Sequence, residues 1–187
     1  MPDTSDFRNG LTILHNDDLW SIVEFQHVKP GKGGAFVRTK LKSVRRGKVV
    51  DNTFRAGEKV EIARVERHPH QFLYSDDLGL HFMHNETYDQ ITVTADAVQG
   101  ADYLKEGETA DALIYIETGE IIKVEVPRHV ELTVVQTDPG FKGDTAQGGS
   151  KPATLESGAV ISVPLFVNEG DVLRVDSETG EYITRVR

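Results

Sequence analysis

The tetrapeptide Glu-Thr-Gly-Glu occurs twice in this chain, at residues 117–120 and again 61 residues later at residues 178–181. Each copy stands between two β-rich runs, and each is preceded by an acidic glycine turn, at 106–108 and at 169–171. A turn, a strand, a hairpin and a further strand therefore occur twice, which predicts two copies of one small β-barrel. A related Ala-Gly-Glu turn at 56–58 indicates a third barrel of similar build.

The spacing of these turns predicts three domains of about 60 residues each, which is small but sufficient for independent barrels. We expect domains at 1–64, 65–128 and 129–187, with boundaries near 64–66 and 127–129.

Short alternating or β-branched runs recur along the chain, whereas amphipathic helical periodicity is nearly absent, so the predicted class is all-β. One modest helix is expected over 97–104, although Gly100 interrupts it. The expected strands are 11–15, 19–27, 35–42, 48–54, 60–66, 71–74, 79–83, 90–94, 112–116, 121–126, 130–136, 160–163, 172–176 and 182–186.

Composition is that of a soluble globular protein, with 38% apolar and 27% charged residues and a net charge of −9. The longest apolar runs, 112–116 and 161–167, are strand-sized and far short of the roughly 20 residues of a spanning helix. No secretory signal is visible at the N-terminus, so we expect no membrane association. The absence of cysteine excludes disulfides and thiolate metal sites, and a reducing cytoplasm is the simplest location.

Charge is segregated along the sequence, because residues 1–64 sum to +4, residues 65–128 to −9 and residues 129–187 to −4. The segment 20–48 alone carries eight basic side chains against the single acid Glu24. One cationic end on an otherwise acidic chain favours a polyanionic partner that is reached by that end alone.

A glycine-rich turn lies at the centre of this basic segment. Pro30 restricts φ, while Gly31, Gly33 and Gly34 supply backbone freedom, so the turn predicts a narrow hairpin tip with Lys32 at its apex. The alternative interpretation is a solvated lysine in a mobile turn.

Motifs of enzymes are missing, since the sequence contains no phosphate-binding loop, nucleophile elbow or zincin helix. Two histidine pairs, His68 with His70 and His81 with His84, show no obvious common face or third ligand, so we expect surface histidines. We therefore expect no enzymatic activity, metal or cofactor. A metalloenzyme built on a histidine pair is the remaining alternative of that class.

Several fixed-spacing motifs carry a resemblance that runs essentially from end to end. Residues 28–38 read Val-Lys-Pro-Gly-Lys-Gly-Gly-Ala-Phe-Val-Arg, and Lys-Pro-Ala-Thr-Leu-Glu-Ser-Gly at 151–158 leads to Val-Pro-Leu-Phe-Val at 163–167. With Gly-Asp-Thr at 143–145 and Glu-Thr-Tyr at 86–88, these segments resemble bacterial translation elongation factor P.

The resemblance implies an SH3-like, KOW-type first barrel followed by two OB-folds, in an L-shaped arrangement with the outline of a transfer RNA. It implies a factor that binds the ribosome beside peptidyl-tRNA, stimulates peptide-bond formation and relieves stalling at consecutive prolines. In the family, the residue at the position of Lys32 reaches the peptidyl-transferase centre. That lysine is often extended covalently by a modifying enzyme.

Other residues are predicted to contact nucleic acid around this tip. Alternation along a strand places Arg38, Lys40 and Lys42 on one face, although a solvated charged face is an equal alternative for any one of them. The predicted phosphate contacts to tRNA and rRNA are Lys29, Arg38, Lys40, Lys42, Arg45 and Arg46.

The long loop 139–149 holds Gly143, Asp144 and Thr145, for which the resemblance implies a contact with messenger RNA or the small subunit. A flexible turn with an Asp cap carries equal weight from the residues alone. Tyr88 is either a contact residue or part of barrel packing, which is the more common fate.

The expected partners are therefore both ribosomal subunits, with their rRNA and peptidyl-tRNA, and a Lys32-modifying enzyme, and the chain is expected to be a monomer. The competing hypothesis is a paralogous ribosome-associated or general RNA-binding OB protein, in which exposed aromatic side chains bind single strands and the tip is incidental.

Overall fold

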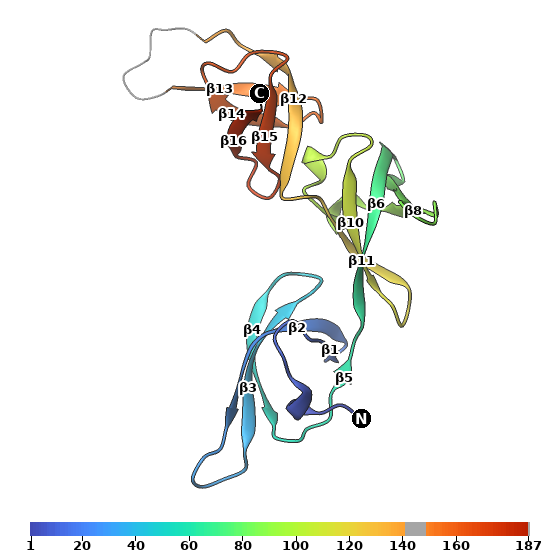
Figure 1. The fold of residues 1–187 in the computed structure, drawn as a ribbon, viewed down its shortest axis with the longest axis vertical. Coiled ribbons are helices and arrows are strands. Elements are labelled where there is room, and N and C mark those ends of the chain that lie inside the picture. Colours follow the sequence, from blue (N-terminus) through green and yellow to red (C-terminus); the bar gives the residue numbers. More distant parts are fainter. Residues whose placement is uncertain (141–148, 187) are drawn as a thin grey trace. The chain divides into compact units, whose positions relative to one another are not determined.

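The computed structural model describes residues 1–140 and 149–186, and within them it contains strands and short 3-10 helices but no α-helix. The strands form three sheets (Figure 1), which confirms the all-β class. Two compact units divide the chain: unit 1 comprises Met1–Arg67 and Leu113–Ile122, and unit 2 comprises His68–Ala112 and Lys123–Arg187.

The first sheet has the strand order β4-β3-β2-β1-β5 and lies in unit 1. Its strands are β1 (Thr12–His15), β2 (Asp18–Val28), β3 (Phe36–Ser43), β4 (Val49–Arg55) and β5 (Glu61–Ile62). A register shift between Ile22 and Glu24 bends β2, the longest strand of this sheet.

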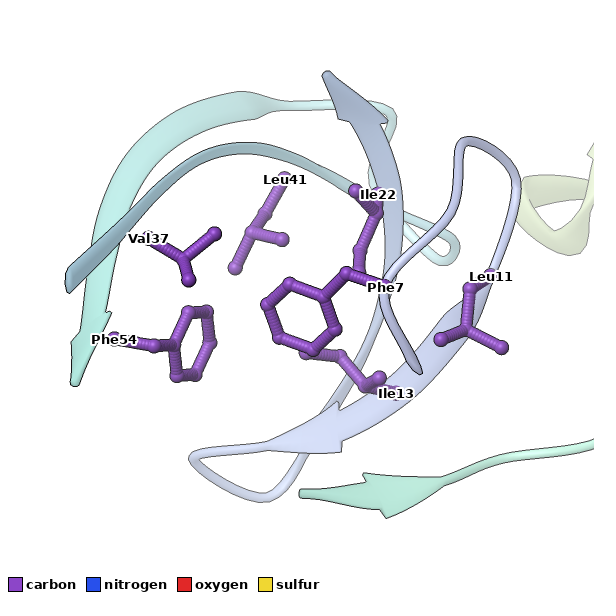
Figure 2. Close-up of a cluster of buried hydrophobic side chains, with 7 residues drawn as sticks. All are labelled: Phe7, Leu11, Ile13, Ile22, Val37, Leu41 and Phe54. Atoms are coloured by element: carbon purple, nitrogen blue, oxygen red, sulfur yellow. The ribbon is translucent and has the colours of Figure 1, made fainter. Parts of the chain in front are cut away.

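The inner side of this sheet encloses a hydrophobic core, whose side chains point toward one another in Figure 2. The ring of Phe7, which precedes β1, packs edge-on against that of Phe54 with 5.3 Å between centroids. Burial of each large side chain is worth about 1.5–3 kcal/mol. The members of this core are Phe7, Leu11, Ile13, Ile22, Val37, Leu41 and Phe54.

The second sheet has the order β8-β7-β6-β10-β11-β9. Its strands are β6 (Val65–Asp76), β7 (Gly79–His84), β8 (Gln90–Val93), β9 (Val98–Gln99), β10 (Thr109–Tyr115) and β11 (Glu120–Glu125). The ends of β10 and β11 that flank their turn belong to unit 1, whereas the remainder of both strands belongs to unit 2.

The third sheet lies in unit 2 and has the order β14-β13-β12-β15-β16. Its strands are β12 (His129–Thr137), β13 (Ser150–Leu155), β14 (Val160–Pro164), β15 (Val172–Asp176) and β16 (Tyr182–Val186). Alternate residues of β12, β13 and β15 are buried, among them Leu132, Leu155 and Leu173.

The sequence repeat is also a structural repeat, because 117–120 and 178–181 join β10 to β11 and β15 to β16 by the same turn. In each copy the glycine N–H donates to the carbonyl four residues earlier, at 2.8 Å. The second glutamate N–H donates to the threonine hydroxyl, at 3.3 Å in both copies.

The predicted helix over 97–104 is wrong. Two 3-10 turns, η2 (Ala95–Ala97) and η3 (Ala101–Tyr103), flank the short strand β9 instead. Gly100 separates β9 from η3 in the left-handed conformation, with φ of 85°. A helix cannot continue through that backbone conformation.

Two strand predictions also need correction. The run 60–66 is divided, because β5 ends at Ile62 and β6 begins at Val65. Strand β13 is missing from the predicted strands. It contains Pro152, which cannot donate to a sheet ladder. In the structure Pro152 pairs with Ser162 of β14. On the side of β12, the Pro152 carbonyl accepts a hydrogen bond from the Thr137 hydroxyl at 2.9 Å.

The expectation of surface histidines is wrong for His70 and His81, whereas His68 and His84 are half-buried. The His70 side chain is buried in β6, with the residue 2% exposed, and its Nδ1 lies 2.8 Å from the His68 carbonyl oxygen. His68, His70 and His84 lie on one face of the sheet. Residues 68 and 70 are two apart on β6, so their side chains point to the same side, and His70 is the cross-strand partner of His84.

His81 is also buried. Its ring stacks on Tyr74 and lies between the Thr92 hydroxyl, at 2.9 Å from Nδ1, and an Asp76 carboxylate oxygen, at 2.8 Å from Nε2. Among residues 1–140 and 149–186, no group of three or more histidine, cysteine or acidic side chains is placed to hold a metal ion.

Candidate nucleic-acid interface

The hairpin between β2 and β3 extends beyond the rest of the first sheet (Figure 1). Its last residue pair is Val28 with Phe36, so residues 29–35 form the tip. The Ala35 carbonyl accepts from the Ala56 N–H at 2.9 Å, which ties the base of the tip to the residue that follows β4. Gly33 has φ of 105°, a backbone conformation that other residues rarely adopt.

Lys32 is exposed on this tip, as sequence analysis predicts. Its ammonium forms no ion pair or hydrogen bond with any described residue. The space around Gly31, Gly33 and Gly34 is open, because a Cβ added at any of them would meet nothing within 4 Å. The Lys32 charge therefore remains solvated and available to a partner.

Strand β3 carries a cationic outer face. Arg38, Lys40 and Lys42 are exposed, whereas the intervening Thr39 and Leu41 are buried. This alternation confirms the prediction that the three basic residues share one face. It also explains their position, because Leu41 contributes to the core shown in Figure 2.

The three charges of this face differ in their neighbours across the sheet. Lys40 lies between Glu24 and Asp51, and its Nζ is 3.2 Å from a Glu24 carboxylate oxygen. Arg38 instead has the neutral neighbours Gln26 and Thr53.

Lys42 resembles Arg38 in this respect, because its neighbours are Ser21 and Val49. The Arg38 guanidinium also lies over the Phe36 ring, 5.4 Å from its centroid, at the tip end of the strand. Arg38 and Lys42 are therefore the uncompensated charges of the face, while Lys40 is compensated locally.

Beyond this face, Lys29 and Arg46 are exposed and form no ion pair with described residues, whereas Arg45 has two acidic partners. Its Nε lies 3.3 Å from Asp18, and its terminal nitrogens bind Glu120. Counting acids only within 20–48 misses Asp18, Asp51 and Glu120, which are distant in sequence or just outside that window.

Sequence analysis also misses Arg55, an exposed cation at the tip end of the first sheet. Arg55 pairs with Phe36 across β3 and β4. Arg55 lies seven residues beyond Lys48 and therefore outside the basic segment 20–48. The alternation along β4 nevertheless indicates that its side chain lies on the exposed face.

Two further predicted contact regions lie on the OB segments. Gly143, Asp144 and Thr145 fall outside the described residues. Next to that loop, the Lys151 ammonium is largely buried and donates to the Asp138 carbonyl at 2.6 Å. Tyr88 is 68% exposed with a positive φ of 62°, so the packing interpretation is wrong for it.

Family models match the chain in three consecutive segments. The elongation factor P KOW-like domain matches residues 3–60, the elongation factor P OB domain matches 65–124, and the elongation factor P C-terminal model matches 130–185.

In the described part of the chain, no helix is long and apolar enough to cross a membrane.

Similar proteins cover the whole chain. It is 61% identical over 186 residues to elongation factor P of Salinibacter ruber, covering 100% of this chain and 97% of that relative. It is 54% identical to elongation factor P of Amoebophilus asiaticus, covering 100% of this chain and 98% of the relative.

A solved structure, the translation initiation factor 5A from Methanococcus jannaschii, is similar in fold, with a TM-score of 0.53 at 20% identity over 66% of this chain and 92% of that one. The matched family models and the full-length relatives define this chain as a translation factor. The chain belongs to the elongation factor P family.

Proposed function

We propose that this chain binds the ribosome beside peptidyl-tRNA and stimulates peptide-bond formation, relieving stalling at consecutive prolines. Its membership of the elongation factor P family supports this proposal. The observation that carries it is Lys32, a solvated and uncompensated ammonium on the tip of the β2–β3 hairpin.

The chemistry of the reaction belongs to ribosomal RNA, and the protein contributes positioning. Proline is sterically restricted, so a peptidyl-tRNA that ends in proline spends little time in a productive geometry. An ammonium at the tip holds the CCA end in place through hydrogen bonds to phosphates or riboses, which lowers the barrier by orientation rather than proton transfer.

The exposed cations whose side chains form no ion pair with described residues supply the electrostatic attachment around that tip. They pair with phosphates and orient the first barrel without reading base sequence. This group consists of Lys29, Arg38, Lys42, Arg46 and Arg55, with Lys40 contributing less because Glu24 and Asp51 flank it.

The remaining parts of the proposal follow the family. The domains are 1–64, 65–128 and 129–187, the protein acts in the cytoplasm as a monomer, and the loop with Gly143, Asp144 and Thr145 contacts messenger RNA or the small subunit. Lys32 is also the proposed substrate of a modifying enzyme, and its exposed position on the tip supports this.

A reconstituted translation reaction on a messenger encoding Pro-Pro-Pro tests the proposal. The Lys32→Ala variant is expected to lose tenfold or more of the stimulation, because it lacks the tip ammonium. A tenfold loss in rate corresponds to about 1.4 kcal/mol in the barrier. Lys48→Ala, which removes an exposed lysine just before β4, is the matched control and should act like the parent. Equal relief of stalling by Lys32→Ala and the parent would overturn the proposal.

Exposed aromatic side chains on the OB segments favour a second candidate, general single-stranded RNA binding. Tyr74, Tyr88 and Phe166 are all exposed, and bases stack on such rings. Tight binding to free single-stranded RNA that is unchanged by Lys32→Ala would support this candidate over the first.

A further inference from the structure

Arg45 and Glu120 are 75 residues apart in sequence and form a two-pronged ion pair. The Arg45 Nη1 lies 2.5 Å from Glu120 Oε1, and Nη2 lies 2.9 Å from Oε2. Arg45 comes from the turn that follows β3, and Glu120 begins β11. Both residues belong to unit 1, so the pair joins the first sheet to the β10–β11 hairpin.

A second carboxylate completes the surroundings of Arg45. Asp18 lies 3.3 Å from its Nε, and the other Asp18 oxygen accepts from the Ser43 hydroxyl at 3.3 Å. The Arg45 side chain is only 35% exposed. Two carboxylates therefore outweigh its single positive charge, and a phosphate that approached Arg45 would be repelled by both.

The contact with Glu120 shifts both ionisations in the direction of the ion pair. It raises the pKa of the Arg45 guanidinium and lowers the pKa of the Glu120 carboxyl. Planar, two-pronged arginine–carboxylate pairs are the strongest and most directional of their kind. The pair consequently fixes orientation as well as proximity.

Beside the ion pair, buried side chains and backbone hydrogen bonds complete the contact between the first sheet and the β10–β11 hairpin, which we call the seam. A buried cluster combines Leu19 of the first sheet with Tyr115 and Ile122 of the β10–β11 hairpin. The Arg64 N–H donates to the Glu117 carboxylate at 3.1 Å, and the Ile116 N–H donates to the Arg64 carbonyl at 2.9 Å.

The second Glu-Thr-Gly-Glu turn repeats this arrangement in unit 2. Ser177, which corresponds to Ile116, donates its N–H to the Arg128 carbonyl at 2.7 Å. A different arginine–carboxylate pair lies beside this turn, with 3.0 Å between Arg128 Nε and Asp176 Oδ2, and neither residue corresponds to Arg45 or Glu120. In both copies the hairpin turn therefore holds the segment that precedes its own sheet.

We infer that Arg45 is a positioning residue, which locks the first sheet and its tip hairpin onto the β10–β11 hairpin through Glu120, and is not a phosphate contact. This replaces the role that sequence analysis predicted for Arg45. The activity readout of its test rests on the proposed function, whereas the structural readout does not.

Charge reversal separates the two roles. Arg45→Glu and Glu120→Arg are each expected to reduce stimulation on the Pro-Pro-Pro messenger at least threefold. The double variant should recover more than half of the loss, with the remainder due to Asp18, which still faces position 45. If Arg45 binds phosphate, the double variant stays as weak as Arg45→Glu, because position 45 is still acidic, and the inference is overturned.

Arg46→Glu is the matched control, since Arg46 is the adjacent exposed arginine and has no described ion pair. Arg46→Glu should reduce stimulation by the same factor in the parent chain and in the Glu120→Arg variant, each compared with its own background. Rescue of Arg46→Glu by Glu120→Arg would show that only net charge matters, which contradicts the inference.

Hydrogen exchange at the Arg64 and Ile116 amides supplies a readout independent of translation, because both amides donate across the seam. Exchange should accelerate severalfold in each single variant and return toward the parent rate in the double variant. Unchanged exchange in the single variants would overturn the inference. A parent chain that fails to stimulate translation, with exchange rescued as expected, would refute the proposed function alone.

Discussion

The Tyr103 side chain covers Gly180, so closely that a Cβ at position 180 would overlap its hydroxyl oxygen. Tyr103 ends η3 and Gly180 belongs to the second Glu-Thr-Gly-Glu turn, so the contact lies within unit 2. The corresponding Gly119 of the first turn has the same backbone conformation, with φ of 72° against 73°, but has nothing within 4 Å. The repeated turn thus has one open copy and one covered copy.

The two glycines form a matched pair for measurement. Gly119→Ala should cost only the strain of a left-handed alanine, about 1 kcal/mol. Gly180→Ala adds a steric overlap with Tyr103 and should cost about 1–3 kcal/mol more. Urea unfolding of the two variants measures the difference.

A Gly180→Ala, Tyr103→Phe double variant then tests the cause. Removing the hydroxyl should recover most of the additional loss, because the next ring atom would be 3.3 Å from the added Cβ. Equal stability of the two single variants would contradict this account.

Burial holds the pKa of His70 below its ordinary value, with the nearby His84 and His68 acting in the same direction. The His68 carbonyl contact and Asp111 oppose that shift. The folded chain therefore keeps His70 neutral, while the unfolded chain takes up a proton first as the pH falls. Unfolding free energy should decrease as the pH falls below about 6.5, the usual histidine value, toward the lower folded pKa.

His70→Asn tests this contribution, since an asparagine amide can still donate to the His68 carbonyl without titrating. The variant should be less stable than the parent at pH 8 but show a flatter decline toward pH 5, measured by hydrogen exchange of β6 and β7 amides. His27→Asn, in which the replaced histidine is exposed in unit 1, should leave the decline unchanged. A parent-like slope in His70→Asn would show that other groups cause the pH dependence.

Phe54 is fully enclosed in the first core, where its ring meets those of Phe7 and His15. Phe54→Ala should destabilise unit 1 by about 3–5 kcal/mol, because it removes buried contacts and leaves a cavity. Trp20, the single tryptophan, packs against this core and reports its unfolding by fluorescence. Val49→Ala, at an exposed position of the same strand, should change stability by less than about 0.5 kcal/mol.

Local patterns predicted those features that depend on residues close together in the chain. The alternation of Arg38, Lys40 and Lys42 with buried neighbours needed only the two-residue period of a strand. The tip around Lys32 followed from Pro30 and the glycines beside it, and the repeated turns followed from a tetrapeptide that makes its own hydrogen bonds.

Features that depend on distant pairing were predicted wrongly or missed. The 97–104 segment has a weak helical pattern, but pairing of β9 with β11 and the left-handed Gly100 prevail there. Likewise, the histidines were expected at the surface because nothing near them in sequence shows that β6 and β7 bring their rings together.

The sequence by itself determined the all-β class, the repeated hairpins, the cationic segment and the lysine at its apex. Each of these features depends only on residues that are close together in the chain. Only the tertiary structure decided which of those cations remain available. Lys40 is compensated across the sheet, and Arg45 is bound by acids 27 and 75 residues away. The reason is physical, since the field at a charge depends on distances in space, which folding sets and sequence separation does not.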